Sequence, residues 1–156
     1  MTNNDILRRV RYIFDFNDSK MIAVFGLADY LITREQISDW LNKDDDPAYQ
    51  KCRDIQLAIF LNGLIIYKRG KKEGPLTEPE QRLTNNIIFR KLKIALNLKA
   101  EDILEIMKLA GIRISKHELS AFFRKPDHKN YRECKDQILR NFLKGVQIKY
   151  RADYKL

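Results

Sequence analysis

The chain has 156 residues, 44% of them apolar, which is enough to build one ordinary domain or two small ones. Lysine and arginine number 30 against 21 acidic residues, and the net charge of +9 favours a polyanionic partner. No apolar run approaches the roughly 20 residues that cross a bilayer. The N-terminus lacks the apolar stretch of a secretory signal and there are only two cysteines, so we expect a cytoplasmic protein with no membrane partner.

The first half of the chain has the apolar spacing of four short helices. Paired asparagines at residues 3 and 4 can cap the first helix, and Thr33 with Gln36 has the spacing of a capping box at the start of the third. The mixed apolar and basic residues after the fourth helix allow a short extended tail. The first helix starts at residue 3, the second spans 19–29, the third starts at 33, the fourth spans 49–64, and the tail is 65–69.

The second half of the chain repeats the first. Residues 1–69 align without a gap with residues 83–151, which indicates two copies of one module. The copied helices start at residue 85, span 101–110, start at 115 and span 131–146, with an extended tail at 147–151.

Glycine, two prolines and mixed charge between the copies are typical of a turn-rich linker. The sequence therefore predicts an all-α fold of two tandem, duplicated modules of about four short helices each. The predicted domains are module 1 at 1–70, the linker at 71–82, module 2 at 83–151 and a C-terminal tail at 152–156.

A Tyr-x-x-Cys-x-Asp motif at residues 49–54 recurs at residues 131–136. Further characteristic segments are residues 2–8, 60–65, 85–87 and 126–134. In these residues the chain resembles the YehS family of small bacterial proteins over essentially its whole length. The resemblance implies two tandem copies of a helical domain of unknown function in a cytoplasmic protein, and it implies no activity, cofactor or catalytic residue.

Residues kept in both modules are interpreted as structural. Cys52 and Cys134 occupy equivalent positions of the predicted last helices, where a small buried side chain fits. A Cys134 nucleophile with His128 as its base is the alternative, but module 1 has no equivalent base. A carboxylate site at the repeated aspartates is another, but no second carboxylate recurs nearby. Because each module keeps an arginine on its first helix and an aspartate on its last, we predict two ion pairs. The predicted pairs are Arg8 with Asp54 and Arg90 with Asp136.

Charge is the main difference between the modules. Residues 83–156 hold 17 basic and 8 acidic residues, whereas residues 1–72 hold 12 and 10. The contrast is greatest in the loop before the last helix, which is acidic in module 1 and basic in module 2. The basic loop and the helix after it could contact phosphates, although ordinary solvated cations would give the same pattern. The candidate nucleic-acid-binding residues are Arg124, Lys125, His128, Lys129, Asn130, Arg132, Lys135 and Arg140.

These patterns favour a non-enzymatic binding protein whose second module contacts RNA or DNA with little sequence preference. A protein-interaction or regulatory adaptor module, or a self-associating repeat, is the alternative. Residues 109–124 are reminiscent of a helix-turn-helix, but the glycine position and the length of the connection argue against it. The sequence has no phosphate-binding glycine loop, no metal-ligand spacing and no nucleophile elbow, so we predict no enzyme activity, metal or cofactor.

Overall fold

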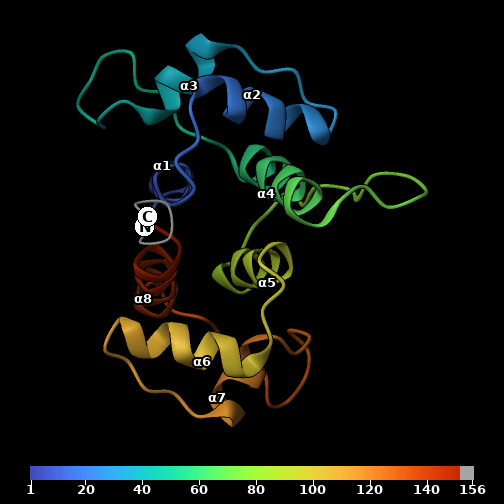
Figure 1. Cartoon of the computed structure of the whole chain (residues 1–156), viewed down its shortest axis with the longest axis vertical. Coiled ribbons are helices and arrows are strands. Elements are labelled where there is room, and N and C mark those ends of the chain that lie inside the picture. The colour runs from blue at the N-terminus through green and yellow to red at the C-terminus, as the bar shows by residue number, and fades with distance from the viewer. Residues whose placement is uncertain (152–156) are drawn as a thin grey trace. The chain divides into compact units, whose positions relative to one another are not determined.

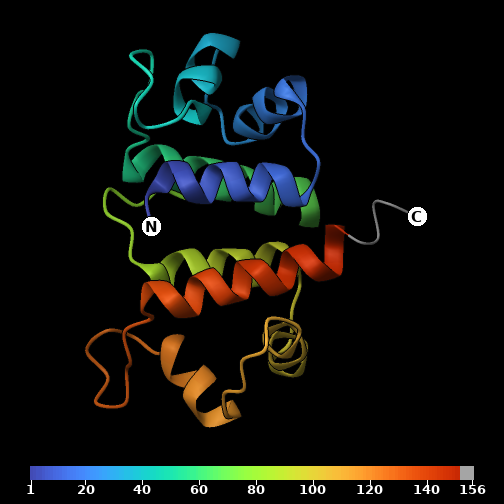
Figure 2. The same ribbon diagram turned by 90° about the vertical axis from the view of Figure 1, so that its left-hand side faces the viewer.

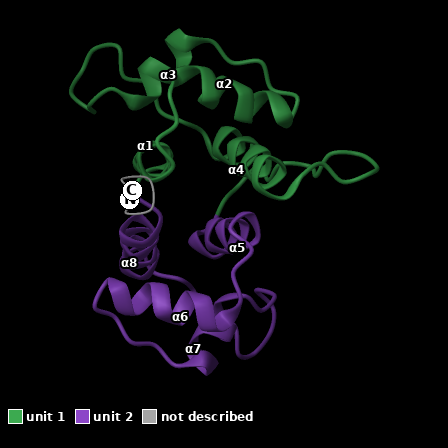
Figure 3. Cartoon of the chain, viewed as in Figure 1, with its two compact units in different colours: residues 1–83 green, residues 84–156 purple. Residues whose placement is uncertain are grey.

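The computed structural model describes residues 1–151. The described chain forms eight α-helices and a five-residue π-helical segment, and it divides into unit 1, residues 1–83, and unit 2, residues 84–156 (Figures 1 and 3). Unit 1 holds α1 (Asn3–Ile13), α2 (Asp18–Leu27), α3 (Arg34–Leu41) and α4 (Asp54–Arg69). Unit 2 holds α5 (Asn85–Ala95), α6 (Ala100–Leu109), α7 (Lys116–Phe122), α8 (Asp136–Val146) and η1 (Gln147–Arg151).

Each unit has two layers of helices. In unit 1, α1 and α4 lie side by side and α2 and α3 cover them, and in unit 2, α5 and α8 are covered by α6 and α7 (Figures 1 and 2). Phe25 of α2 is fully buried against Trp40 and Phe60 in the first core. Phe89 of α5 has the same role in the second, where its ring centre lies 4.5 Å from that of Phe142. None of the helices in residues 1–151 has the length and apolarity that crossing a bilayer requires.

The helix starts follow ordinary capping chemistry. The predicted capping boxes at Thr33 and Ser115 are both present. The predicted asparagine cap of α1 is wrong by one residue, because the Thr2 hydroxyl accepts the Asp5 amide at 3.1 Å and the Asp5 carboxylate accepts the Thr2 amide at 2.9 Å. The paired asparagines lie inside the first turn of α1, where their side chains are free for another task.

The last helix of each unit begins later than predicted, and α4 also ends later, whereas α8 ends at Val146 as predicted. The helices start at Asp54 and Asp136 rather than at residues 49 and 131, because the preceding segments are extended and bonded to α1 and α5. The extended tails are also wrong. Residues 65–69 continue α4 up to Gly70, whose φ of 87° ends the helix, and residues 147–151 form the π-helical segment. The predicted tail at 152–156 lies outside the described residues.

Candidate nucleic-acid interface

A buried asparagine in each unit fixes the segment that precedes the last helix. In unit 2 the Asn86 Nδ2 donates to the carbonyl oxygens of Phe122 and Arg132, at 3.0 and 2.8 Å, and its Oδ1 accepts the Cys134 amide at 2.9 Å. In unit 1, Asn4 makes the same three bonds, to the equivalent residues 40, 50 and 52. A buried amide that joins three backbone groups satisfies what would otherwise be unpaired donors and acceptors. The two ends of the basic loop are therefore held to α5.

The neighbouring asparagine holds the start of the last helix. The Asn85 Nδ2 donates to the Cys134 carbonyl at 3.0 Å and to the Asp136 carboxylate at 2.7 Å. This hydrogen bond is the leading cause that lowers the pKa of Asp136. Asn3 bonds Asp54 in the same way, also at 2.7 Å. The repeated Asn-Asn and Cys-x-Asp motifs are therefore one hydrogen-bonded structural unit.

The predicted arginine–aspartate pairs are wrong. Arg8 pairs with Asp5 at 3.2 Å and donates to the Asn42 carbonyl, whereas Asp54 accepts from Asn3 and from the Leu83 amide. In unit 2, Asp136 bonds Asn85 and Arg90 is exposed. The reason is geometric: the aspartate at the start of the last helix lies next to the first turn of α1 or α5, and the arginine lies more than a turn further along.

The loop between α7 and α8 extends away from the helices of unit 2 (Figure 2), and two of the predicted cations, Lys125 and Lys129, are exposed on it. Its backbone turns where the Lys125 carbonyl accepts the His128 amide at 2.9 Å, and the His128 Nδ1 accepts the Asn130 amide at 3.0 Å. A neutral imidazole that accepts at Nδ1 carries its proton at Nε2. All six residues of 125–130 are exposed, the acidic Asp127 and the candidates Lys125, His128, Lys129 and Asn130 among them.

The remaining predicted residues are more scattered. Arg124 is half-buried at the end of α7, and its Nε is buried without a hydrogen-bond partner among the described residues. Arg132 is exposed beyond the loop. Lys135 pairs with Glu133 at 3.4 Å, and that carboxylate offsets the positive charge of the lysine. Arg140 lies one turn into α8, where it bonds Gln137. The structure thus brings residues 124–130 together in one loop and leaves Arg140 on a separate helix.

Cys52 and Cys134 are buried as predicted, but they lie two residues before the last helices rather than within them. The Cys134 Sγ contacts the Lys135 carbonyl, and no described base lies within hydrogen-bond reach of it. Burial, followed by the nearby aspartate, raises the pKa of each thiol to about 12. The geometry therefore gives neither cysteine the features of a nucleophile.

We expect both thiols to resist Ellman's reagent at pH 8 in the native protein and to react fully in denaturant. Unfolded thiols ionise near pH 8.5, so the stability that comes from keeping the buried thiols neutral is complete below that pH and is lost as the pH rises toward 12. Unfolding midpoints should fall over this range. Rapid labelling of the native protein would contradict the burial of the thiols.

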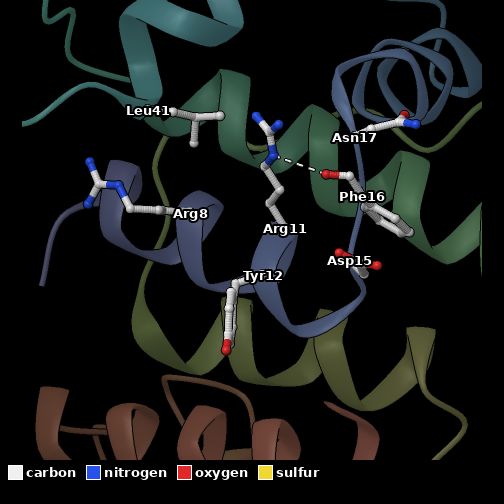
Figure 4. A pocket seen from close by; sticks show the side chains of 7 residues that line it. All are labelled: Arg8, Arg11, Tyr12, Asp15, Phe16, Asn17 and Leu41. Carbon is white, nitrogen blue, oxygen red and sulfur yellow. Dashed lines mark hydrogen bonds between the residues drawn. The ribbon is translucent and has the colours of Figure 1, made fainter. Parts of the chain in front are cut away.

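A groove in unit 1 is lined by two arginines of α1 (Figure 4). It has a volume of about 590 Å³ and lies beside Arg8 and Arg11. The Arg11 Nε donates to the Phe16 carbonyl at 3.0 Å, and its guanidinium pairs with Asp18 at 2.9 Å. The equivalent cations of unit 2 are Arg90 and Lys93. They were not among the binding candidates predicted from the sequence, although the alignment of the two modules pointed to them. The groove is lined by Arg8, Arg11, Tyr12, Asp15, Phe16, Asn17 and Leu41.

The two units define the class of this protein, which is an all-α protein built from two tandem copies of a four-helix module. The chain belongs to the family described as protein of unknown function DUF1456, whose profile matches residues 3–70 and again residues 85–152. It is 50% identical over 147 residues to the uncharacterized protein YehS of Escherichia coli (strain K12), covering 94% of each chain. No solved structure matches. These findings confirm the predicted family and the duplication.

Proposed function

We propose that this chain is a non-enzymatic binding protein and that unit 2 binds RNA or DNA through phosphate contacts of the 124–130 loop. One observation carries the proposal: the two units hold the same loop with the same asparagine bonds, yet present opposite charge on it. Asp44, Asp45 and Asp46 stand in the loop of unit 1, whereas Arg124, Lys125 and Lys129 stand in that of unit 2.

Contacts of this kind give affinity without base recognition. Exposed cations neutralise phosphates and release counterions, so affinity falls steeply with salt. The short helix α7 offers little for reading bases, because Leu119 and Phe122 are committed to the core. The proposal is therefore binding with little sequence preference.

The test is fluorescence anisotropy of labelled single-stranded RNA, single-stranded DNA and duplex DNA, over about 50 to 200 mM salt. We expect binding that weakens steeply with salt and is lost in the triple variant Arg124→Glu, Lys125→Glu, Lys129→Glu. The matched control reverses the same number of charges at exposed positions elsewhere. The control substitutions are Lys43→Glu, Lys71→Glu and Lys72→Glu.

The control should keep most of the affinity, which would separate a local interface from the effect of net charge. Equal losses in the two triple variants would mean that the loop has no special role. Absence of binding at the lowest salt would overturn the proposal.

A protein-interaction module, such as an adaptor or a self-associating repeat, is the second candidate. It is favoured by the end of α2, where Leu27 is 38% exposed, and by the connection after it, where Leu31 is 97% exposed. Exposed apolar side chains of this kind are typical of docking surfaces when they gather in one patch. Self-association or protein binding whose affinity does not change with salt, and is not reduced by the triple charge reversal, would favour this candidate over phosphate binding.

A further inference from the structure

The first helix of each unit carries three cations at equivalent positions, and in unit 1 two of them are neutralised by carboxylates. Arg8 pairs with Asp5 at 3.2 Å, and Arg11 pairs with Asp18 at 2.9 Å. Both side chains are also held by carbonyl oxygens, those of Asn42 and Phe16. An arginine bonded to a carboxylate offers little attraction to a second anion. The α1 face of unit 1 is therefore a poor phosphate site.

Unit 2 keeps the cations and lacks both carboxylates. Arg90 and Lys93 stand where unit 1 has its two arginines, whereas Ile87 and Ala100 stand where it has Asp5 and Asp18. Among the described residues, neither Arg90 nor Lys93 has an ion-pair partner. Lysine also replaces Asn17, at residue 99, and asparagine replaces Asp15, at residue 97. Equivalent surfaces thus differ by the loss of three acidic residues and the gain of one cation.

The cations of α5 adjoin the basic loop. The Lys93 Nζ lies over the ring of Phe123, 5.2 Å from its centre, and Phe123 directly precedes Arg124. In unit 1 the Arg8 guanidinium reaches the Asn42 carbonyl, and Asn42 is the equivalent of Arg124. The Arg90 side chain starts from the equivalent position on α5. A row of positive charge therefore leads from α5 to the start of the 124–130 loop.

We infer that the phosphate-binding surface of unit 2 extends from the 124–130 loop over α5, with Arg90 and Lys93 as contacts, and that its ligand is a polynucleotide backbone rather than a single phosphate. This inference rests on the proposed function. Cations on two separate elements can all be neutralised only by a ligand with several linked phosphates. The equivalent surface on α1 of unit 1 has its positive charge neutralised by carboxylates.

The first test is the double variant Arg90→Gln, Lys93→Gln, measured with a labelled 20-nucleotide single strand of thymidine. Two lost phosphate contacts should reduce the salt slope by about 1.4 and the affinity on the order of tenfold at 0.1 M salt. The control is Lys71→Gln, Lys72→Gln, which removes the same charge from exposed positions of the linker. Inorganic phosphate at an equal phosphate concentration should not compete.

A second variant restores the neutralising group of unit 1. Ala100→Asp places a carboxylate at the position of Asp18, at the start of α6, where an acidic side chain also favours the helix. The variant should fold at least as stably as the wild type, as judged by its thermal midpoint, and should weaken binding several-fold. Exposed Ser38→Asp on α3 adds the same charge in unit 1 and is its control.

The outcomes separate the two proposals. If the wild type binds, the loop reversal abolishes binding, and the Arg90→Gln, Lys93→Gln and Ala100→Asp variants behave like their controls, the extension over α5 is wrong and the proposed function stands. If inorganic phosphate competes fully, the ligand is a small anion and the inference is overturned. If the wild type does not bind nucleic acid, both proposals fail together.

Discussion

Replacing Gly63 by alanine should destabilise unit 1 by about 3 kcal/mol. A Cβ at this position of α4 would lie 2.1 Å from the carbonyl oxygen of Val24 in α2, and that oxygen belongs to helix backbone that cannot move aside cheaply. The two helices would have to separate, which would loosen the core around Phe25 and Phe60. Trp40, the single tryptophan, is buried in this core, so its fluorescence during urea unfolding measures the effect.

The matched control is Gly26→Ala. Gly26 lies within α2, and a Cβ there would meet nothing within 4 Å, so alanine should stabilise the helix by up to about 1 kcal/mol. Unit 2 repeats the close crossing, since a Cβ on Gly145 would lie 2.1 Å from the Ile106 carbonyl oxygen. If the unfolding midpoint of Gly63→Ala equals that of the wild type, the methyl group fits between α2 and α4 and the prediction is wrong.

Features with a local cause were predictable from the sequence. The capping boxes at Thr33 and Ser115 depend on residues three positions apart, and the apolar spacing of the short helices depends on neighbours within two turns. The duplication was visible because the two copies align without a gap. Burial of Cys52 and Cys134 followed from their equivalent positions, even though they were placed on the wrong element.

Features with a long-range cause were not predictable. The segment before the last helix has a helix-like pattern, but its backbone bonds to an asparagine more than 40 residues away, so the helix starts at Asp54. Asparagine is a good N-cap, and that preference hid the role of Asn4 as a buried bridge. The arginine–aspartate pairing failed for the same reason, because charge pattern alone does not say which polar group lies nearest to Asp54.

The candidate interface was only half visible in the sequence. The loop at residues 124–130 stands out by its own charge, whereas Arg90 and Lys93 look ordinary until their unit 1 counterparts are seen to be paired. What matters there is the absence of Asp5 and Asp18 from the second copy. A count of cations along one copy does not detect that difference, and a comparison of the two copies in the folded structure does.

The bridging asparagine should be the other position where a single substitution has a large effect. Asn86→Ala would leave two carbonyl oxygens and the Cys134 amide without their partner, at a cost of about 3 kcal/mol in the free energy of unfolding. Asn86→Asp should not restore the lost stability, because a carboxylate can accept a hydrogen bond from the amide but repels the two carbonyl oxygens. Urea unfolding followed by circular dichroism measures the loss, and exposed Asn130→Ala is the control.

The same bridge holds the ends of the basic loop, so its loss should also affect binding. If the 124–130 loop binds phosphates as proposed, Asn86→Ala should weaken nucleic-acid affinity under conditions where the protein is still folded, although the side chain itself is buried and touches no ligand. The equivalent Asn4→Ala in unit 1 should lower stability by a similar amount without changing affinity, because it loosens the acidic loop instead. Equal affinity losses in the two variants would mean that binding responds to global stability and not to the position of the basic loop.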